Sequence, residues 1–337
     1  MPQCMEKYKN DFAIEFAKVM QKNLLVWKEL QKTYTRHLYG KEWITGYIIS
    51  FLCGFIPGRH ERNYDVRFHF WLAVALFIGS IITAISVENK DYQKDIKKDL
   101  FPKLLKVFGK DIKYGAGGDF YSSSGPVYSS GYISNSVYDN SMLFKKPVSS
   151  DSADDKFTGV YNDCPFTISE SEVTNIQRYK NGKSDTTQLF KGVAMHFKMQ
   201  KKVKSRVLIY SKGLFDKVPD DFEKVEFEYE KFNKKYNVYV QKSKDESRGQ
   251  IEARYLFNTA FMDRFMQLHT SFRISKMQCS IYEDSVLILL STNKDLFEMN
   301  HLFCRIDDIN QYKKLFDEFA SVFSFLEILN LSSKTGL

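Results

Sequence analysis

The chain has 337 residues, of which 43% are hydrophobic and 27% are charged, and its formal net charge is +8. This balance is ordinary for a folded protein and excludes a chain that is disordered throughout. The five cysteines lie far apart and the six histidines are isolated, so the spacings of zinc sites and of common catalytic motifs are absent. We therefore predict no metal, no cofactor and no catalytic residue.

The positive charge does not predict a nucleic-acid partner, because the basic residues are spread along the whole chain. The densest patch is QKKVKSR at residues 200–206, and no aromatic residues interleave with it. It lies between two strand-like runs, where a solvated turn is expected. Attraction to anionic lipid explains the charge at least as well.

Residues 1–42 are predicted to form an amphipathic helix at the cytoplasmic face. Large apolar residues recur there at three-, four- or seven-residue steps, with lysines between them. Two interpretations stay open: this stripe lies on the inner leaflet of a membrane, or it packs on the chain's own soluble domain or on a partner helix. The stripe consists of Tyr8, Phe12, Phe16, Met20, Trp27, Leu30 and Tyr34.

Residues 43–87 predict a transmembrane hairpin. Residues 68–87 carry no formal charge and, as a helix, span about 30 Å, the thickness of the hydrocarbon layer. Residues 43–56 are apolar but span only roughly 21 Å. A second span is therefore favoured, and an interfacial or re-entrant helix is the alternative.

Lysine and arginine counts predict that both ends of this hairpin are cytoplasmic. Eight precede residue 43, six lie between residues 90 and 106, and three lie in the connection at residues 59–67. The predicted location is the cell inner membrane, with several passes and a cytoplasmic soluble domain. No signal peptide is expected, because the first apolar run begins beyond residue 40.

The remainder is predicted to be a juxtamembrane helix (residues 88–113), a Gly/Ser/Tyr-rich loop (114–143) and a soluble domain (144–337). Residues 277–290 read as a hairpin that turns at Glu283 and Asp284. Strands in blocks followed by helices predict the α+β class, with a mostly antiparallel sheet and at least two helices. Other strand-like runs cover residues 188–199, 206–210, 225–229 and 236–240, and helical periodicity covers 252–269 and 307–329.

Three segments carry a family resemblance: TGVYNDCPFTISESEV at 158–173, LFKGV at 189–193, and a run at 222–265 that contains IEARYL. In order and spacing they resemble the bacterial family catalogued as domain of unknown function 3137, over most of residues 95–330. The resemblance implies a bacterial membrane protein with N-terminal hydrophobic segments and a LemA-type membrane protein as a partner, and it supplies no activity. The matching positions are Gly159, Asp163, Phe166, Ser169, Glu170, Phe190, Lys191, Gly192, Glu252, Ala253, Arg254 and Tyr255.

These observations predict a membrane-anchored, non-enzymatic binding or scaffold module at the cytoplasmic face of a bacterial membrane. The alternatives are an uncharacterised enzyme acting on a membrane-proximal substrate and a pore-forming or transport subunit. The candidate binding residues are Lys191, Glu252 and Arg254, as polar groups that flank apolar elements. The structural alternative is that Glu252 caps a helix N-terminus and that Arg254 forms a salt bridge elsewhere in the fold.

Overall fold

The computed structural model divides into two compact units. The sheet unit contains Met1–Glu15, Phe101–Phe297 and Tyr312–Leu337, and the helical unit contains Phe16–Leu100 and Glu298–Gln311. The residues described are 3–53, 66–108, 112–116, 119–122, 125–127, 133–180, 182–213, 220–242, 248–294, 296–299 and 301–334.

In its described residues, the sheet unit contains one nine-stranded antiparallel sheet in the order β3-β2-β1-β4-β5-β6-β8-β7, with β9 paired to β6. The α+β class and the antiparallel sheet predicted from the sequence are confirmed. The strands are β1 (Lys113–Ala116), β2 (Asp119–Ser122), β3 (Gly125–Val127), β4 (Ser150–Tyr161), β5 (Cys164–Arg178), β6 (Ser184–Ser211), β7 (Phe222–Val225), β8 (Tyr236–Gln241) and β9 (Lys276–Ser291).

Strand β6 organises the sheet, because its 28 residues pair with β5, β8 and β9. Its pairing with β9 shifts register between Lys198 and Val203 and again before Val207, and such bulges bend a strand without ending it. The predicted turn at residues 200–206 is therefore wrong. The predicted hairpin in residues 277–290 is also wrong: β9 is one strand, and Glu283 has a φ of 49° where it faces the bulged part of β6.

The predicted loop at residues 114–143 holds regular structure in its described parts. Strands β1, β2 and β3 form a small antiparallel extension of the sheet, and helix α4 (Asn135–Ser141) follows. Tyr114 is buried, and its ring centroid lies 5.1 Å from that of Phe101 and 5.2 Å from that of Phe157. Among the described residues of this stretch, Gly115, Ser122 and Gly125 thus lie inside short strands.

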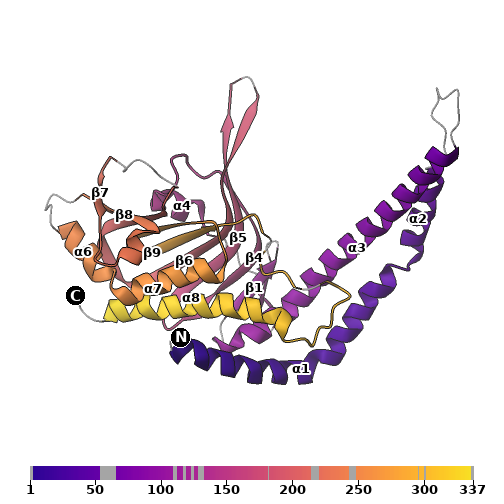
Figure 1. The fold of residues 1–337 in the computed structure, drawn as a ribbon, viewed down its shortest axis with the longest axis horizontal. Helices are drawn as coiled ribbons and strands as arrows, with labels where there is room; N and C mark the ends of the chain where they lie inside the picture. Colours follow the sequence, from indigo (N-terminus) through magenta and orange to yellow (C-terminus); the bar gives the residue numbers. More distant parts are fainter. Residues whose placement is uncertain are drawn as a thin grey trace. The chain divides into compact units, whose positions relative to one another are not determined.

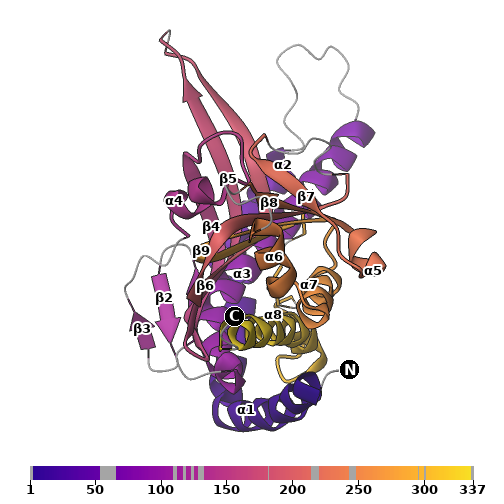
Figure 2. The same cartoon turned by 90° about the vertical axis from the view of Figure 1, so that its left-hand side faces the viewer.

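Helices cover both faces of the sheet: α4 lies on one face, and α7 (Thr259–Ser271) and α8 (Asn310–Lys334) lie on the other (Figure 1 and Figure 2). Aromatic rings join α8 to the strands, with centroid distances of 4.7 Å from Phe319 to Phe157 and 5.4 Å from Phe323 to Phe166. These phenylalanines are buried, as the helical periodicity of residues 307–329 predicts.

The helix predicted at residues 252–269 is two helices, α6 (Arg248–Leu256) and α7. The side chain of Asn258 accepts a hydrogen bond from the backbone N–H of Phe261 at 2.9 Å, which is an N-cap that starts the second helix. The strand predicted at residues 225–229 lies earlier than expected. Strand β7 ends at Val225, and a short helix, α5 (Glu230–Asn233), follows it.

The helical unit is built around α3 (Val66–Leu104), which is followed by the 3₁₀ turn η1 (Leu105–Val107). Helix α1 (Gln3–His37) packs on α3 through polar contacts: Trp27 Nε1 donates to Asp99 at 2.8 Å and the Tyr34 hydroxyl donates to Asp95 at 2.5 Å. Its apolar stripe is buried inside the protein at Phe16, Met20 and Trp27. Burial of these residues favours the interpretation that the stripe packs on the chain itself, and contact of the helix with the inner leaflet stays a prediction.

Helix α2 (Lys41–Cys53) runs antiparallel to α3. Trp43 Nε1 donates to Glu88 at 3.0 Å, and the rings of Tyr47 and Phe51 lie 6.2 and 6.0 Å from that of Phe77. The described residues contain one helix long and apolar enough to cross a membrane, and it is α3. The expected juxtamembrane helix is part of that same uninterrupted helix. The connection predicted at residues 59–67 lies largely outside the described residues.

We expect Gly192→Ala to destabilise the sheet unit strongly. Gly192 has a φ of +143°, and an added Cβ lies 2.1 Å from the backbone oxygen of Leu290. Because backbone on the neighbouring strand has to move, the cost is on the order of 3 kcal/mol, measured by chemical denaturation of the detergent-solubilised chain. Gly182→Ala is the matched control: φ is +79° with no atom within 4 Å of the added Cβ, so about 1 kcal/mol is expected. Equal losses would refute the steric argument.

Glu318 on α8 makes stability depend on pH. Burial raises the pKa of its carboxyl to about 7, and Lys314, whose Nζ lies 3.5 Å away, offsets the shift only in part. A carboxyl that protonates more easily when folded weakens the fold as pH rises from about 4.5 to about 7.

We therefore expect Glu318→Gln to gain free energy of unfolding over the wild type between pH 5 and pH 8, by up to about 3 kcal/mol. Thermal unfolding of the purified chain across this range measures the difference. Glu228→Gln, at an exposed carboxylate after β7, controls for the loss of one negative charge. A constant difference between Glu318→Gln and the wild type at every pH contradicts the prediction.

Candidate functional site

Lys191, the first residue predicted to bind, lines a groove of about 340 Å³ on the sheet unit, which we call the sheet groove. Its walls combine carboxylates with two ammonium groups. They are formed by Ser152, Asp154, Glu170, Ser171, Glu172, Lys191, Asn293 and Lys294.

Strand register brings these residues together. Glu172 on β5 lies directly opposite Lys191 on β6, and Lys191 Nζ lies 3.1 Å from the Glu172 carboxylate. Both side chains are roughly half-exposed. The carboxylate of Glu170 accepts a hydrogen bond from the backbone N–H of Leu296 at 3.3 Å, which ties the segment after β9 to the groove. Because the groove carries charges of both signs, it suits ligands with both amine and acidic or hydroxyl groups.

A buried polar cluster lies beside this groove. Asp151 accepts hydrogen bonds from the Tyr138 hydroxyl at 3.1 Å and from Ser171 at 3.4 Å, and the Ser169 and Ser171 hydroxyls are 2.8 Å apart. Burial raises the pKa of Asp151, while the hydrogen bonds from Tyr138 and Ser171 and the charge of Lys156 lower it. No group of three or more His, Cys, Asp or Glu side chains suited to a metal occurs among the residues described.

The other two predicted binding residues, Glu252 and Arg254, lie elsewhere, on α6. This helix approaches β6 closely at Gly249, where an added Cβ would lie 3.6 Å from Ser205 Oγ. Lys191 precedes Ser205 by 14 residues on β6, on the order of 40 Å along an extended strand. The three residues therefore do not share one site.

The sequence also suggested structural roles for these two residues, a helix cap for Glu252 and a salt bridge for Arg254. Helix α6 begins at Arg248, so Glu252 lies beyond its first turn and the predicted N-terminal cap is wrong. Arg254 is exposed on the same helix. A binding role for either residue stays a prediction.

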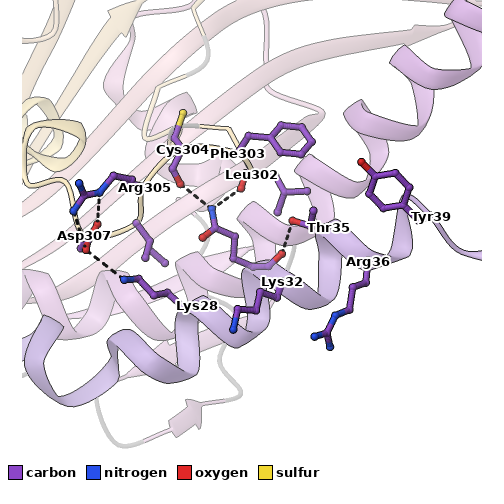
Figure 3. Close-up of a pocket in the computed structure, with 12 residues that line it drawn as sticks. Lys28, Lys32, Thr35, Arg36, Tyr39, Leu302, Phe303, Cys304, Arg305 and Asp307 are labelled. Atoms are coloured by element: carbon purple, nitrogen blue, oxygen red, sulfur yellow. Dashed lines mark hydrogen bonds and ion pairs between the residues drawn. The ribbon is translucent and has the colours of Figure 1, made fainter.

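A second groove, of about 580 Å³, lies within the helical unit between α1 and residues 302–307 (Figure 3). We call it the α1 groove. The Gln31 amide holds its two sides together by donating to the backbone oxygens of Leu302 at 2.5 Å and Cys304 at 2.7 Å. Its lining is Lys28, Gln31, Lys32, Thr35, Arg36, Tyr39, Leu302, Phe303, Cys304, Arg305, Ile306 and Asp307.

Cations follow one side of the α1 groove at four-residue spacing, at Lys28, Lys32 and Arg36, which places them on one face of the helix. Asp307 is within ion-pair distance of Lys28 at 3.5 Å and of Arg305 at 3.1 Å. The spacing of this basic row is visible in the sequence. Its partner segment is not, because Gln31 and Leu302 are 271 residues apart.

Comparison with known proteins finds a match to one family model over part of the chain, and that model carries no activity. Residues 188–331 match the family model described as "Protein of unknown function (DUF3137)". No curated protein matches the sequence. The crystal structure of the mycobacterial trehalose monomycolate transport factor A, TtfA, is similar at 12% identity and a TM-score of 0.32, over 57% of this chain and 82% of that chain. A likeness at this TM-score supports no conclusion about the present chain.

We expect Lys191→Ala to leave the free energy of unfolding unchanged within about 0.5 kcal/mol, because half-exposed ion pairs contribute little to stability. Chemical denaturation measures this, with Glu172→Ala as the reciprocal variant. A loss above about 2 kcal/mol would instead make Lys191 a structural residue. With stability preserved, any loss of ligand or partner binding in Lys191→Ala reports on the sheet groove itself.

Proposed function

We propose that this chain, whose residues 188–331 match the DUF3137 family model of unknown function, is a membrane-anchored, non-enzymatic binding or scaffold module. In this proposal α2 and α3 form a transmembrane hairpin in a bacterial inner membrane. The sheet unit then lies in the cytoplasm and presents its surface to a partner.

The observation that carries the proposal is a reversal of burial along α3. In its apolar first half, Trp71 is 67% exposed and Ile82 is 58% exposed. In its charged second half, Tyr92, Ile96 and Leu100 are at most 2% exposed. A water-soluble helix buries its most apolar stretch, so the exposed stretch of α3 requires a non-aqueous neighbour. A bilayer supplies one over the full length of that stretch.

The arrangement of α2 supports two spans rather than one. Its exposed apolar residues include Ile48, Ile49 and Leu52, and it lies antiparallel to the exposed half of α3. Its 13 helical residues rise about 20 Å, which requires local thinning of the bilayer or further apolar residues beyond Cys53. Trp43 at its start suits the membrane interface. The excess of lysine and arginine outside the hairpin favours cytoplasmic termini.

A binding role suits the two grooves. Both are lined by ion pairs and hydrogen bonds, which is typical of surfaces that recognise polar groups. The family resemblance makes a LemA-type membrane protein the first partner to test, by co-purification of the tagged chain in mild detergent with Lys191→Ala alongside. The observation that favours the alternative, an enzyme acting on a membrane-proximal substrate, is the raised pKa of Asp151 beside the sheet groove.

Cysteine accessibility tests the anchor and its orientation. Cys164 and Cys279 are buried, whereas Cys304 is exposed and serves as the reporter of the soluble side. In a variant with Cys4 and Cys53 replaced by serine, we expect a membrane-impermeant maleimide to label Cys304 only after the cells are permeabilised. A second reporter, His60→Cys with Cys304→Ser, is expected to be labelled in intact cells, because it lies in the connection between the two proposed spans.

The outcomes separate the alternatives. Labelling of Cys304 in intact cells would place the soluble part outside the cytoplasm and refute the proposed orientation. Protection of both reporters in intact cells would mean that the connection does not reach the far side of the membrane, and it would refute the hairpin. Release of the chain from membranes by alkaline carbonate would refute the anchor itself.

A further inference from the structure

The α1 groove has an excess of positive charge that its own carboxylate does not neutralise. Four cationic side chains line it, Lys28, Lys32, Arg36 and Arg305, against the carboxylate of Asp307. Lys28 and Arg305 share Asp307, and Lys32 pairs with the exposed Glu29 at 2.6 Å. Within the described part of the chain, the Arg36 guanidinium forms no ion pair. In Figure 3, Lys32 and Arg36 extend from α1 in the same direction, on the side of the helix away from Phe303 and Leu302.

Apolar side chains adjoin these cations. Phe303 is 60% exposed and Tyr39 is also exposed, although both are large and aromatic, and Leu302 and Ile306 line the same groove. Side chains of this kind are costly to leave in water but are common where a surface meets an amphiphile. The groove thus combines groups that bind a phosphate with groups that bind hydrocarbon.

The groove also lies close, along the chain, to the helices assigned to the membrane. Arg36, in the last turn of α1, precedes Trp43, in the first turn of α2, by seven residues. Trp43 is hydrogen-bonded to Glu88, the first charged residue after the apolar stretch of α3. Long basic side chains at this level reach the lipid headgroups while their apolar neighbours face the acyl chains.

We infer that the α1 groove binds an anionic phospholipid, with its phosphate held by Lys32 and Arg36 and its acyl chains against Phe303 and Tyr39. Arginine is well matched to phosphate, because its planar guanidinium donates two parallel hydrogen bonds. The inference rests on the proposed membrane hairpin, which brings the groove to the bilayer surface. It deepens that function by naming a ligand class for the helical unit.

The test measures lipid binding to the full chain, purified in an uncharged maltoside detergent. Phosphatidylglycerol and phosphatidylcholine are titrated separately, and bound lipid is counted by native mass spectrometry. The wild type is expected to bind phosphatidylglycerol at least about tenfold more tightly than phosphatidylcholine, because only the former carries a net negative charge. Lys32→Gln/Arg36→Gln is expected to remove most of that preference and to leave binding of phosphatidylcholine unchanged.

A matched control carries the same change in charge outside the groove. Lys22→Gln/Lys94→Gln removes two exposed cations from α1 and α3 and is expected to keep the preference of the wild type. Phe303→Ser tests the apolar half: it is expected to weaken binding of long-chain phosphatidylglycerol without changing the thermal midpoint, because its side chain is largely exposed. Circular dichroism establishes that each variant is folded.

Each outcome decides the inference. Equal loss in both double variants would mean general electrostatic attraction, and no loss in either would mean that the lipid binds elsewhere; both overturn the site. Displacement of the lipid by millimolar glycerol 3-phosphate, with no effect of Phe303→Ser, would identify a soluble phosphate ligand and overturn the lipid assignment. Carbonate extraction of the same variants keeps this result separate from the anchor: a chain that stays in membranes without a lipid preference refutes the groove alone.

Discussion

Helix α3 is one continuous helix whose two halves require different surroundings, and the helical unit follows from that constraint. Its backbone hydrogen bonds are satisfied internally from the apolar half into the charged half, ahead of Pro102 near its end, so the helix can pass from a non-aqueous to an aqueous environment without a break. The side chains, in contrast, differ between the two halves, because apolar and charged side chains favour different environments. The apolar first half is exposed, and the second half is covered by the protein.

The contacts of α1 and α2 with α3 reflect this division. Polar anchors from α1 meet the second half of α3 at Asp95 and Asp99, where hydrogen bonds to carboxylates suit a partly hydrated packing. Against the first half, α2 offers aromatic rings at Tyr47 and Phe51. Trp43 and Glu88 meet at the boundary between the two zones. In the sheet unit the corresponding constraint is β6, which pairs with three strands, β5, β8 and β9, and is bulged opposite β9. Gly192 allows the backbone of β9 to approach β6 closely, because it has no Cβ.

The sequence correctly predicted those helices and strands whose positions follow from a local periodicity of apolar residues. The apolar run of α3, the amphipathic α1, the buried face of α8 and the antiparallel α+β class all follow from such patterns. The errors arose where tertiary pairing overrides a local signal. Glu283 and Asp284 and the lysines near residue 200 were both predicted to form turns, yet they lie within strands, because β6 carries extra residues opposite β9 at this point.

The candidate sites were predicted less well than the fold, because each depends on residues distant in the sequence. Lys191 was predicted from the sequence, but its partner Glu172 follows from strand register, and the link from Glu170 to Leu296 spans 126 residues. Arg254, predicted as a second binding residue, lies on a helix that approaches β6 far from Lys191. The loop at residues 302–307 has no pattern of its own, and only its docking on Gln31 makes a groove.

Spin-label accessibility at the middle of the first half of α3 tests whether this stretch lies in hydrocarbon. A nitroxide attached through Ile78→Cys, in a chain otherwise free of reactive cysteines and reconstituted into lipid nanodiscs, can collide with oxygen or with a water-soluble nickel chelate. Ile78 is 50% exposed, so the label has room on the helix surface. We expect strong relaxation by oxygen and weak relaxation by the nickel chelate. Strong relaxation by the chelate would mean that water surrounds this stretch, and it would refute the proposed transmembrane helix.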